Sequence, residues 1–252
     1  MPWNPSQYNT FKKERFAPAF DLIAQIDKKP NLKVIDLGCG TGELTAELAK
    51  LLPGSHVTGI DNSKEMLEQC PNGAQLKFEN KTIENQLLSD EKWDLIFANA
   101  SLQWVENHQY LFPKIISKLN PGGQLAIQMP CQKENILNGL LYDLASEEPF
   151  SSALNNYNRT SPVLTMDEYA QILFDENSHD INIYQKVYPL IARDHETLYE
   201  FISGSAAIPY MERLPDNLKD KFKTDFMLKI QKTFRKIPAI YAFKRLFIVA
   251  NF

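Results

Sequence analysis

Short apolar runs alternate with amphipathic stretches along the first half of the chain. Each run is followed by apolar residues at intervals of three or four, as Leu44, Leu48, Leu51 and Leu52 show, and this spacing is typical of one helix face. The runs predict strands at residues 34–37, 56–61, 76–80, 93–100 and 124–129. Regular alternation of strands and helices favours the α/β class, here a doubly wound and mostly parallel sheet.

The alternation stops at residue 131. We expect residues 1–130 to form an N-terminal helix and one half of the sheet domain, with the helix at about residues 11–26. Two helical inserts, 131–163 and 192–243, are predicted to make a cap, while 164–191 and 244–252 supply the last helix and strands. Thr165 and Glu168 have the spacing of a capping box that opens a helix.

Three alternate glycines, Gly38, Gly40 and Gly42, follow the first strand directly. Because glycine has no Cβ, such a turn can adopt conformations that other residues avoid, and its backbone can approach a ligand closely. Asp36 ends the strand, and Cys39 fits the turn as a small residue; we expect both to line the ligand together with the three glycines. The G-x-G-x-G spacing suits adenosine with an attached amino acid better than the pyrophosphate of a dinucleotide.

An acid at the end of the second strand is a candidate for the ribose of that ligand. Asp61 lies 19 positions beyond Gly42, near the spacing at which doubly wound folds place a carboxylate against ribose hydroxyls. The alternative is a turn aspartate that serves the following helix. Asn62, with Glu65 three residues later, is expected to cap that helix and to contact the ligand.

The ends of the next two strands supply the remaining ligand contacts. Thr82 and Ile83 follow the third strand, where the adenine ring is expected. Asn99 ends the fourth strand and therefore faces the crevice at the carboxyl ends of the parallel strands.

Composition and sequence pattern argue against several classes of binding partner, namely nucleic acid, a membrane and a metal ion. A formal net charge of -4 leaves no basic stripe for nucleic acid. We find no apolar run long enough for a membrane span and no signal-peptide pattern, so we expect a cytoplasmic protein without a membrane partner. The three cysteines lack disulfide or metal spacing, and no metal site is expected.

With these elements in place, the chain resembles the trans-aconitate 2-methyltransferase family of class I, S-adenosylmethionine-dependent methyltransferases. The class-level motifs are the glycine turn, Asp61 and residues 120–123, which read Asn-Pro-Gly-Gly. The narrower resemblance covers nearly the whole chain and rests on Trp3-Asn4-Pro5 with Tyr8, Phe11, Glu14 and Arg15, on residues 94–104, on His108, on 111–113, on Gln128-Met129-Pro130 and on 245–250.

The resemblance implies a Rossmann-like sheet of seven strands, the last one antiparallel. It also implies methyl transfer from S-adenosyl-L-methionine to a carboxylate of a small polycarboxylic acid. In the family pattern Gly38, Gly40 and Gly42 line the methionine part of the cofactor, Asp61 holds the ribose and Asn99 lies beside the sulfonium.

The expected acceptor contacts are Tyr8, Arg15, Gln103, Trp104, His108 and Tyr210. Three of these have ordinary structural alternatives: an exposed ion-paired helix residue for Arg15, a core residue for Trp104 and a hydrogen-bonded loop residue for His108. No general base is expected, because a carboxylate is already ionised at neutral pH. We expect a monomer or a weak homodimer.

The chain departs from the family where it has Thr82 in place of an acid, and where the stretch before Pro209 lacks an arginine. The second departure falls in the expected acceptor pocket and leaves the identity of the acid open. A methyltransferase with another acceptor, a thioester-linked carboxylate or a hydroxyl, is an alternative. A non-catalytic protein that binds S-adenosylmethionine is a further alternative, as is a nicotinamide-dependent oxidoreductase, although no Tyr-x-x-x-Lys pair supports the oxidoreductase.

Overall fold

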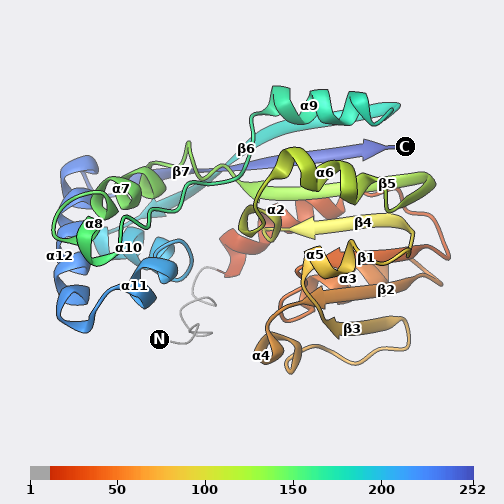
Figure 1. Ribbon diagram of the computed structural model, residues 1–252, viewed down its shortest axis with the longest axis horizontal. Coiled ribbons are helices and arrows are strands. Elements are labelled where there is room, and N and C mark those ends of the chain that lie inside the picture. The colour runs from red at the N-terminus through yellow and green to blue at the C-terminus, as the bar shows by residue number, and fades with distance from the viewer. Residues whose placement is uncertain (1–11) are drawn as a thin grey trace. The chain divides into compact units, whose positions relative to one another are not determined.

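A seven-stranded sheet in the order β3-β2-β1-β4-β5-β7-β6 organises the protein (Figure 1). The computed structural model describes residues 12–252, with side chains from residue 16 onward. The strands are β1 (Lys33–Leu37), β2 (His56–Asp61), β3 (Leu76–Asn80), β4 (Trp93–Asn99), β5 (Leu119–Pro130), β6 (Asp180–Ala192) and β7 (Ala239–Asn251). The first five strands are parallel and β7 is antiparallel to β5, which confirms the predicted fold class.

Helices cover both faces of this sheet. The connection through α3 (Glu43–Leu51) runs from β1 to β2, whereas α6 (His108–Ile116) leads from β4 outward to β5 on the other side of β1. Because such crossovers are right-handed, α3 and α6 lie on opposite faces. The segment just beyond α2 (Lys12–Ile23) lies against the sheet face that carries the Gln124 side chain, because Gln124 on β5 bonds Asp27 N and Gln25 O.

Short helices complete the connections, namely α4 (Lys64–Leu67), α5 (Ile83–Gln86), the 3-10 turn η1 (Leu102–Trp104) and α9 (Met166–Asp175). The capping box at the start of α9 is present: Thr165 Oγ1 accepts from Glu168 N, and Glu168 accepts from Thr165 N. The sequence prediction at this helix is therefore confirmed.

The chain divides into two compact units. The sheet unit comprises residues 17–130, 162–186 and 245–252, and the helical unit comprises 131–161 and 187–244 together with the start of α2. Strands β6 and β7 each continue from one unit into the other, so both are longer than the runs 181–188 and 245–250 that the sequence pattern shows. The sequence pattern predicts residues 162–163 in the first helical insert and residues 187–191 with the sheet. The structure instead assigns 162–163 to the sheet unit and 187–191 to the helical unit.

The helical unit has its own apolar core. Its helices are α7 (Ile136–Ala145), α8 (Phe150–Ala153), α10 (His195–Ser203), α11 (Ile208–Arg213) and α12 (Asp216–Thr233). Phe222, Phe226 and Ile230 recur every four residues on α12 and are almost fully buried. They pack in one cluster with the buried side chains of α7 and α10 and the ends of β6 and β7. Apolar residues at helical spacing therefore form the core of the helical unit.

Candidate functional site

The glycine turn after β1 has one open side. Gly38, Gly40 and Gly42 have φ angles of +80°, +56° and +69°. A Cβ at Gly38 would lie 2.4 Å from Ser101 Cβ, and one at Gly42 would lie 2.7 Å from the Phe78 ring. Among the described residues, no heavy atom would come within 4 Å of a Cβ at Gly40. The turn is thus packed at its two ends and leaves its middle open to a ligand.

The turn rests on the second strand through close backbone contact. Gly38 N and Cys39 N both donate to Ile60 O at 2.9 Å. A Cβ at Gly59 would lie 2.9 Å from Cys39 Cβ, so this strand glycine is what allows the approach. Sequence reasoning missed Gly59, although an isolated glycine inside an apolar strand was the available signal.

Asp61 fastens the same turn to the end of β2. Its Oδ2 accepts from Gly40 N and its Oδ1 accepts from Ser63 N, both at 2.9 Å. A carboxylate has about four acceptor positions, so two bonds leave it able to accept from hydroxyl groups as well. The structural and the ribose-binding interpretations of Asp61 are therefore compatible.

The predicted cap of α4 was wrong by one residue. Ser63 is the N-cap, with its Oγ accepting from Met66 N at 3.2 Å, and Asn62 is exposed. Because Asp61 fixes Ser63 N, the serine hydroxyl and not the Asn62 amide is directed at the first turn of the helix. A ligand contact by Asn62 remains a prediction.

Asp36 is a buried acid beneath the turn. Its side chain is 2% exposed, and Thr45 Oγ1 donates to Asp36 Oδ2 at 2.6 Å. Burial raises the pKa of Asp36 to about 7, the Thr45 bond opposes this rise, and the nearby Asp61 charge adds to it. Asp36 therefore titrates near neutral pH, and a positively charged ligand nearby would favour its ionised form.

One thiol lies in the turn and a second lies beside it. Cys39 Sγ and Cys70 Sγ lie 3.8 Å and 3.6 Å from Gly40 O. Burial raises the pKa of both thiols, and the Asp36 and Asp61 charges raise the two pKa values further. Both side chains are therefore neutral at physiological pH and act here as small apolar groups with weak donors.

At the end of β3, Thr82 is committed to the helix that follows. It is the N-cap of α5, and its Oγ1 accepts from Asn85 N at 3.1 Å. Ile83 is 9% exposed. The Thr82 hydroxyl has a structural partner, so contact between an adenine ring and these residues remains a prediction.

The backbone turns sharply where β4 ends at Asn99. Ala100 has φ +53°, a left-handed conformation that is costly for a residue with a Cβ. Three bonds hold it: Ala100 N donates to Gln128 O at 2.8 Å, Gln103 Nε2 donates to Ala100 O at 2.7 Å, and Ser101 Oγ bonds Leu37 O. Strained backbone that is fixed in this way is common at functional sites.

Buried polar side chains gather on one sheet face at the carboxyl ends of β4 and β5. Asn99 is in register with Gln128, and Arg245 on β7 is in register with Pro130. Side chains of paired residues and of residues two apart on a strand share a face, so Asn99, Gln128 and Arg245 lie on one face. Gln128 and Arg245 are 1% and 6% exposed. Sequence reasoning missed both as site candidates because they lie within apolar runs.

Other predicted acceptor residues have different surroundings. His108 is 1% exposed, with Nδ1 bonded to Tyr169 Oη and Nε2 3.0 Å from Leu102 O. Both ring nitrogens are thus engaged, and the ring packs with Phe112 and Tyr169 between α6 and α9. The structure gives His108 a packing role where the sequence suggested an acceptor contact.

Tyr210 belongs to the core of the helical unit. Its hydroxyl donates to Asn158 Oδ1 at 2.8 Å and accepts from Arg159 N at 3.0 Å, and burial raises its pKa. Trp104 on η1 is 42% exposed. Tyr8 lies outside the described residues, and Arg15 lies in α2 where only the backbone is described.

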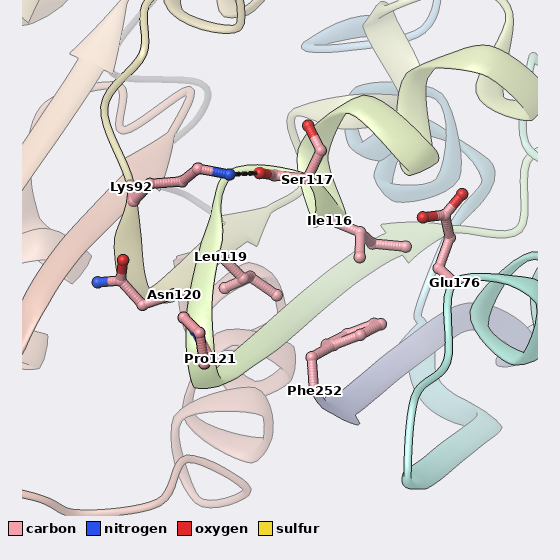
Figure 2. A pocket seen from close by; sticks show the side chains of 8 residues that line it. All are labelled: Lys92, Ile116, Ser117, Leu119, Asn120, Pro121, Glu176 and Phe252. Atoms are coloured by element: carbon pink, nitrogen blue, oxygen red, sulfur yellow. Dashed lines mark hydrogen bonds between the residues drawn. The ribbon is translucent and has the colours of Figure 1, made fainter.

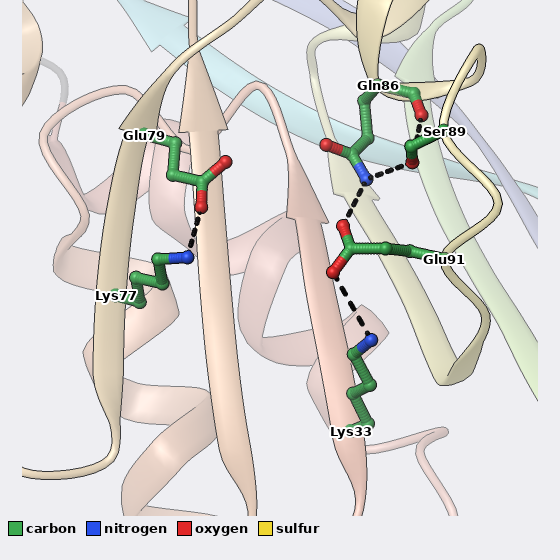
Figure 3. A network of polar contacts seen from close by, with 6 residues as sticks. All are labelled: Lys33, Lys77, Glu79, Gln86, Ser89 and Glu91. Carbon is green, nitrogen blue, oxygen red and sulfur yellow. Dashed lines mark hydrogen bonds and ion pairs between the residues drawn. The ribbon is translucent and has the colours of Figure 1, made fainter.

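The opposite edge of the sheet, where the parallel strands begin, carries other features. A hollow of about 400 Å³ lies there, between the starts of β4 and β5 and the end of β7. Figure 2 shows the side chains that line it, Ile116, Leu119 and Phe252 among them. In Figure 3, Glu91 bonds Gln86 Nε2 at 3.1 Å and pairs with Lys33 at 3.4 Å. These contacts tie β1 to the segment before β4 and are remote from the glycine turn.

Within residues 12–252, no three His, Cys, Asp or Glu side chains are grouped as metal ligands would be. No helix in the described chain combines the length and the apolar character that crossing a membrane requires.

Comparison with known proteins identifies the family to which a chain with this glycine turn belongs. The model of a family described as "Methyltransferase domain" matches residues 28–233. A trans-aconitate 2-methyltransferase from Deinococcus radiodurans is 40% identical over 262 residues, which cover 100% of this chain and 98% of that protein. The chain belongs to the trans-aconitate 2-methyltransferase family.

A second relative of the same name, from Variovorax paradoxus, is 33% identical over 100% of this chain and 98% of its own length. Among solved structures, the YcgJ protein from Bacillus subtilis shares the fold with a TM-score of 0.61 at 14% identity, over 93% of this chain and 97% of that chain. The protein is therefore a methyltransferase, and its cofactor is S-adenosyl-L-methionine.

Proposed function

We propose that the enzyme transfers a methyl group to a carboxylate of a small polycarboxylic acid, trans-aconitate or an acid of similar shape and charge. The observation that carries this proposal is the 40% identity, over its full length, to a protein named trans-aconitate 2-methyltransferase. The matched length covers the helical unit as well as the sheet unit, so it includes more than the glycine turn.

The open middle of the glycine turn fits the cofactor. In this proposal the methionine part lies against Gly40, where a Cβ would otherwise stand, with Gly38 and Gly42 shaping the turn. Asp61 accepts from the ribose hydroxyls through its remaining acceptor positions, Thr82 and Ile83 flank the adenine, and Asn99 lies beside the sulfonium. Asp36 and Asp61 place negative charge next to a cofactor that carries positive charge.

Bound there, the cofactor supplies an electrophilic methyl group: the carboxylate oxygen bonds to the methyl carbon while the carbon–sulfur bond breaks and its electron pair stays on sulfur. A carboxylate has an ordinary pKa near 4, so the acceptor is ionised at neutral pH and no side chain has to remove a proton. The contribution of the protein is orientation and exclusion of water, which together supply several kcal/mol or more of rate acceleration.

The acceptor requires groups that recognise its other carboxylates. Arg15 remains our candidate cation for this role, since a guanidinium binds a carboxylate through two parallel hydrogen bonds. Tyr8, Gln103 and Trp104 remain predicted contacts. Because both nitrogens of His108 and the hydroxyl of Tyr210 are engaged within the protein, we assign these two residues to packing.

A transfer assay with methyl-labelled cofactor tests the proposal. The protein is offered trans-aconitate, citrate, tricarballylate and short dicarboxylates, and labelled product is treated with mild alkali. We expect trans-aconitate to give the highest kcat/KM and a label that alkali releases, because a methyl ester hydrolyses and an ether does not. Alkali-stable label would indicate a hydroxyl acceptor, and tight cofactor binding without turnover on any acid would favour a sensor.

We also propose that the enzyme works in the cytoplasm as a monomer or weak homodimer. Its three cysteines are free, as is usual in a reducing compartment. Cell fractionation and sedimentation at several protein concentrations test these two statements separately.

A further inference from the structure

One buried side chain near the proposed methyl-transfer site has no hydrogen-bond partner. Gln128 is 1% exposed, and neither its Oε1 nor its Nε2 has a partner among the described residues. Buried polar atoms in folded proteins nearly always find partners, so an amide with neither end satisfied requires an explanation. A ligand that the amide binds during function is one such explanation.

The strand itself provides a comparison. Gln124 lies four residues earlier on β5, so its side chain is on the same face, and it is 6% exposed. Its Oε1 accepts from Asp27 N at 3.0 Å and its Nε2 donates to Gln25 O at 3.3 Å. Both ends of the Gln124 amide therefore have a partner, whereas neither end of the Gln128 amide, at the carboxyl end of the strand, has one in the described chain.

The position of Gln128 is that of a ligand contact. It is in register with Asn99, whose Oδ1 is also buried without a partner in the described chain. The backbone carbonyl oxygen of Gln128 accepts from Ala100 N at 2.8 Å and so helps to fix the strained turn that follows Asn99. In open α/β sheets ligands bind at this edge, outside the carboxyl ends of the strands.

We propose that Gln128 binds the carboxylate that becomes methylated, with Nε2 donating to the oxygen that does not attack. This inference rests on the proposed function and adds the residue that orients the reacting group. A neutral amide suits the task, because it holds the carboxylate without withdrawing as much electron density from the attacking oxygen as a cation would. No proton is transferred, so Gln128 acts by binding alone.

The test uses the full-length protein saturated with S-adenosylhomocysteine and measures trans-aconitate binding by calorimetry. The variants are Gln128→Leu, which keeps the bulk and removes the amide, and Gln128→Glu, which keeps the shape and adds a negative charge. Gln124→Leu is the matched control from the same strand and face. Thermal unfolding and the Kd for the cofactor are recorded for each, followed by kcat and KM on trans-aconitate.

We expect Gln128→Leu to unfold at or above the wild-type temperature, because it removes an unsatisfied buried amide. Its Kd for trans-aconitate should rise about tenfold or more, as expected for a lost hydrogen bond to a charged group, and its cofactor Kd should change less than about twofold. Gln128→Glu should bind the acid still more weakly. Gln124→Leu should unfold at a lower temperature and keep the wild-type Kd for the acid.

An unchanged Kd in Gln128→Leu overturns the inference, as does an equal loss in Gln128→Leu and Gln124→Leu, which would indicate general damage to the sheet. If Gln128→Leu does not fold, the Kd of the isosteric Gln128→Glu variant for trans-aconitate is used instead, and an unchanged Kd again overturns the inference. Methyl transfer by the wild type with no effect of the Gln128 variants refutes this inference alone. Binding that depends on Gln128 without methyl transfer refutes the proposed function alone, and absence of binding refutes both.

Discussion

Replacing Gly40 by alanine separates ligand binding from folding at the glycine turn. The new Cβ would meet no described heavy atom within 4 Å, so the substitution adds no collision within the protein. Gly40 has φ +56°, and a left-handed conformation costs an L-residue about 1–2 kcal/mol. For a chain of this size we expect the unfolding temperature to fall by about 2–8 °C.

The same methyl group occupies the open side of the turn, where we place the cofactor. The Kd for S-adenosylmethionine, measured by calorimetry, should therefore rise at least about tenfold, which corresponds to about 1.4 kcal/mol. Gly42→Ala is the matched control: its φ is similar, but its Cβ would lie 2.7 Å from Phe78, which adds about 1–3 kcal/mol of overpacking. That variant should lose more stability and less cofactor affinity.

Opposite results would refute this reasoning. If Gly40→Ala binds the cofactor as the wild type does, the open side of the turn is not the binding surface. If Gly42→Ala loses affinity while its stability is unchanged, the open and packed sides have been assigned the wrong way round.

Three further predictions follow from the site and the fold. Asp36 has its pKa raised by burial from 3.8 to about 7, so the folded state holds the proton more tightly and stability must fall as the pH rises from about 4 to about 7. About two pH units of this range lie between pH 5 and pH 8, so Asp36→Asn should remove a fall of about 3 kcal/mol between urea unfolding at these two pH values, and a slope that persists would contradict the reasoning. Thr165→Ala should cost about 1 kcal/mol and lower the unfolding temperature by about 2–4 °C, with no change in cofactor Kd, because it removes the cap of α9. Because burial raises both thiol pKa values, iodoacetamide at pH 7.5 should alkylate Cys39 and Cys70 more slowly than free cysteine, and fast labelling followed by mass spectrometry would argue against neutral thiols.

Local signals in the sequence predicted the centre of the site. Three alternate glycines between an apolar run and a helical pattern specify strand, turn and helix through backbone conformation alone, and all three do have positive φ. The capping box at Thr165 is equally local and was equally reliable. Where neighbouring residues compete, as Asn62 and Ser63 do for the α4 cap, the outcome depended on a hydrogen bond from Ser63 N to Asp61.

Features that depend on contacts distant in sequence could not be predicted in this way. The His108–Tyr169 pair joins residues 61 positions apart, so the sequence alone left the role of the histidine open. The need for glycine at position 59 follows from the contact of β2 with Cys39. The contrast between Gln124 and Gln128 depends on which partners each amide meets, and the apolar pattern of the strand is silent about that.

The central claim is that the carboxylate oxygen of an acid acceptor receives the methyl group of S-adenosylmethionine. The most direct measurement is an NMR spectrum of the product formed from trans-aconitate and cofactor labelled with ¹³C in the methyl group. We predict one labelled methyl group per product molecule, bonded to an ester oxygen, and much slower formation of labelled product when Gly40→Ala replaces the wild type at a cofactor concentration below its raised Kd. Label bonded to carbon, or no labelled product from the wild type, would contradict the account.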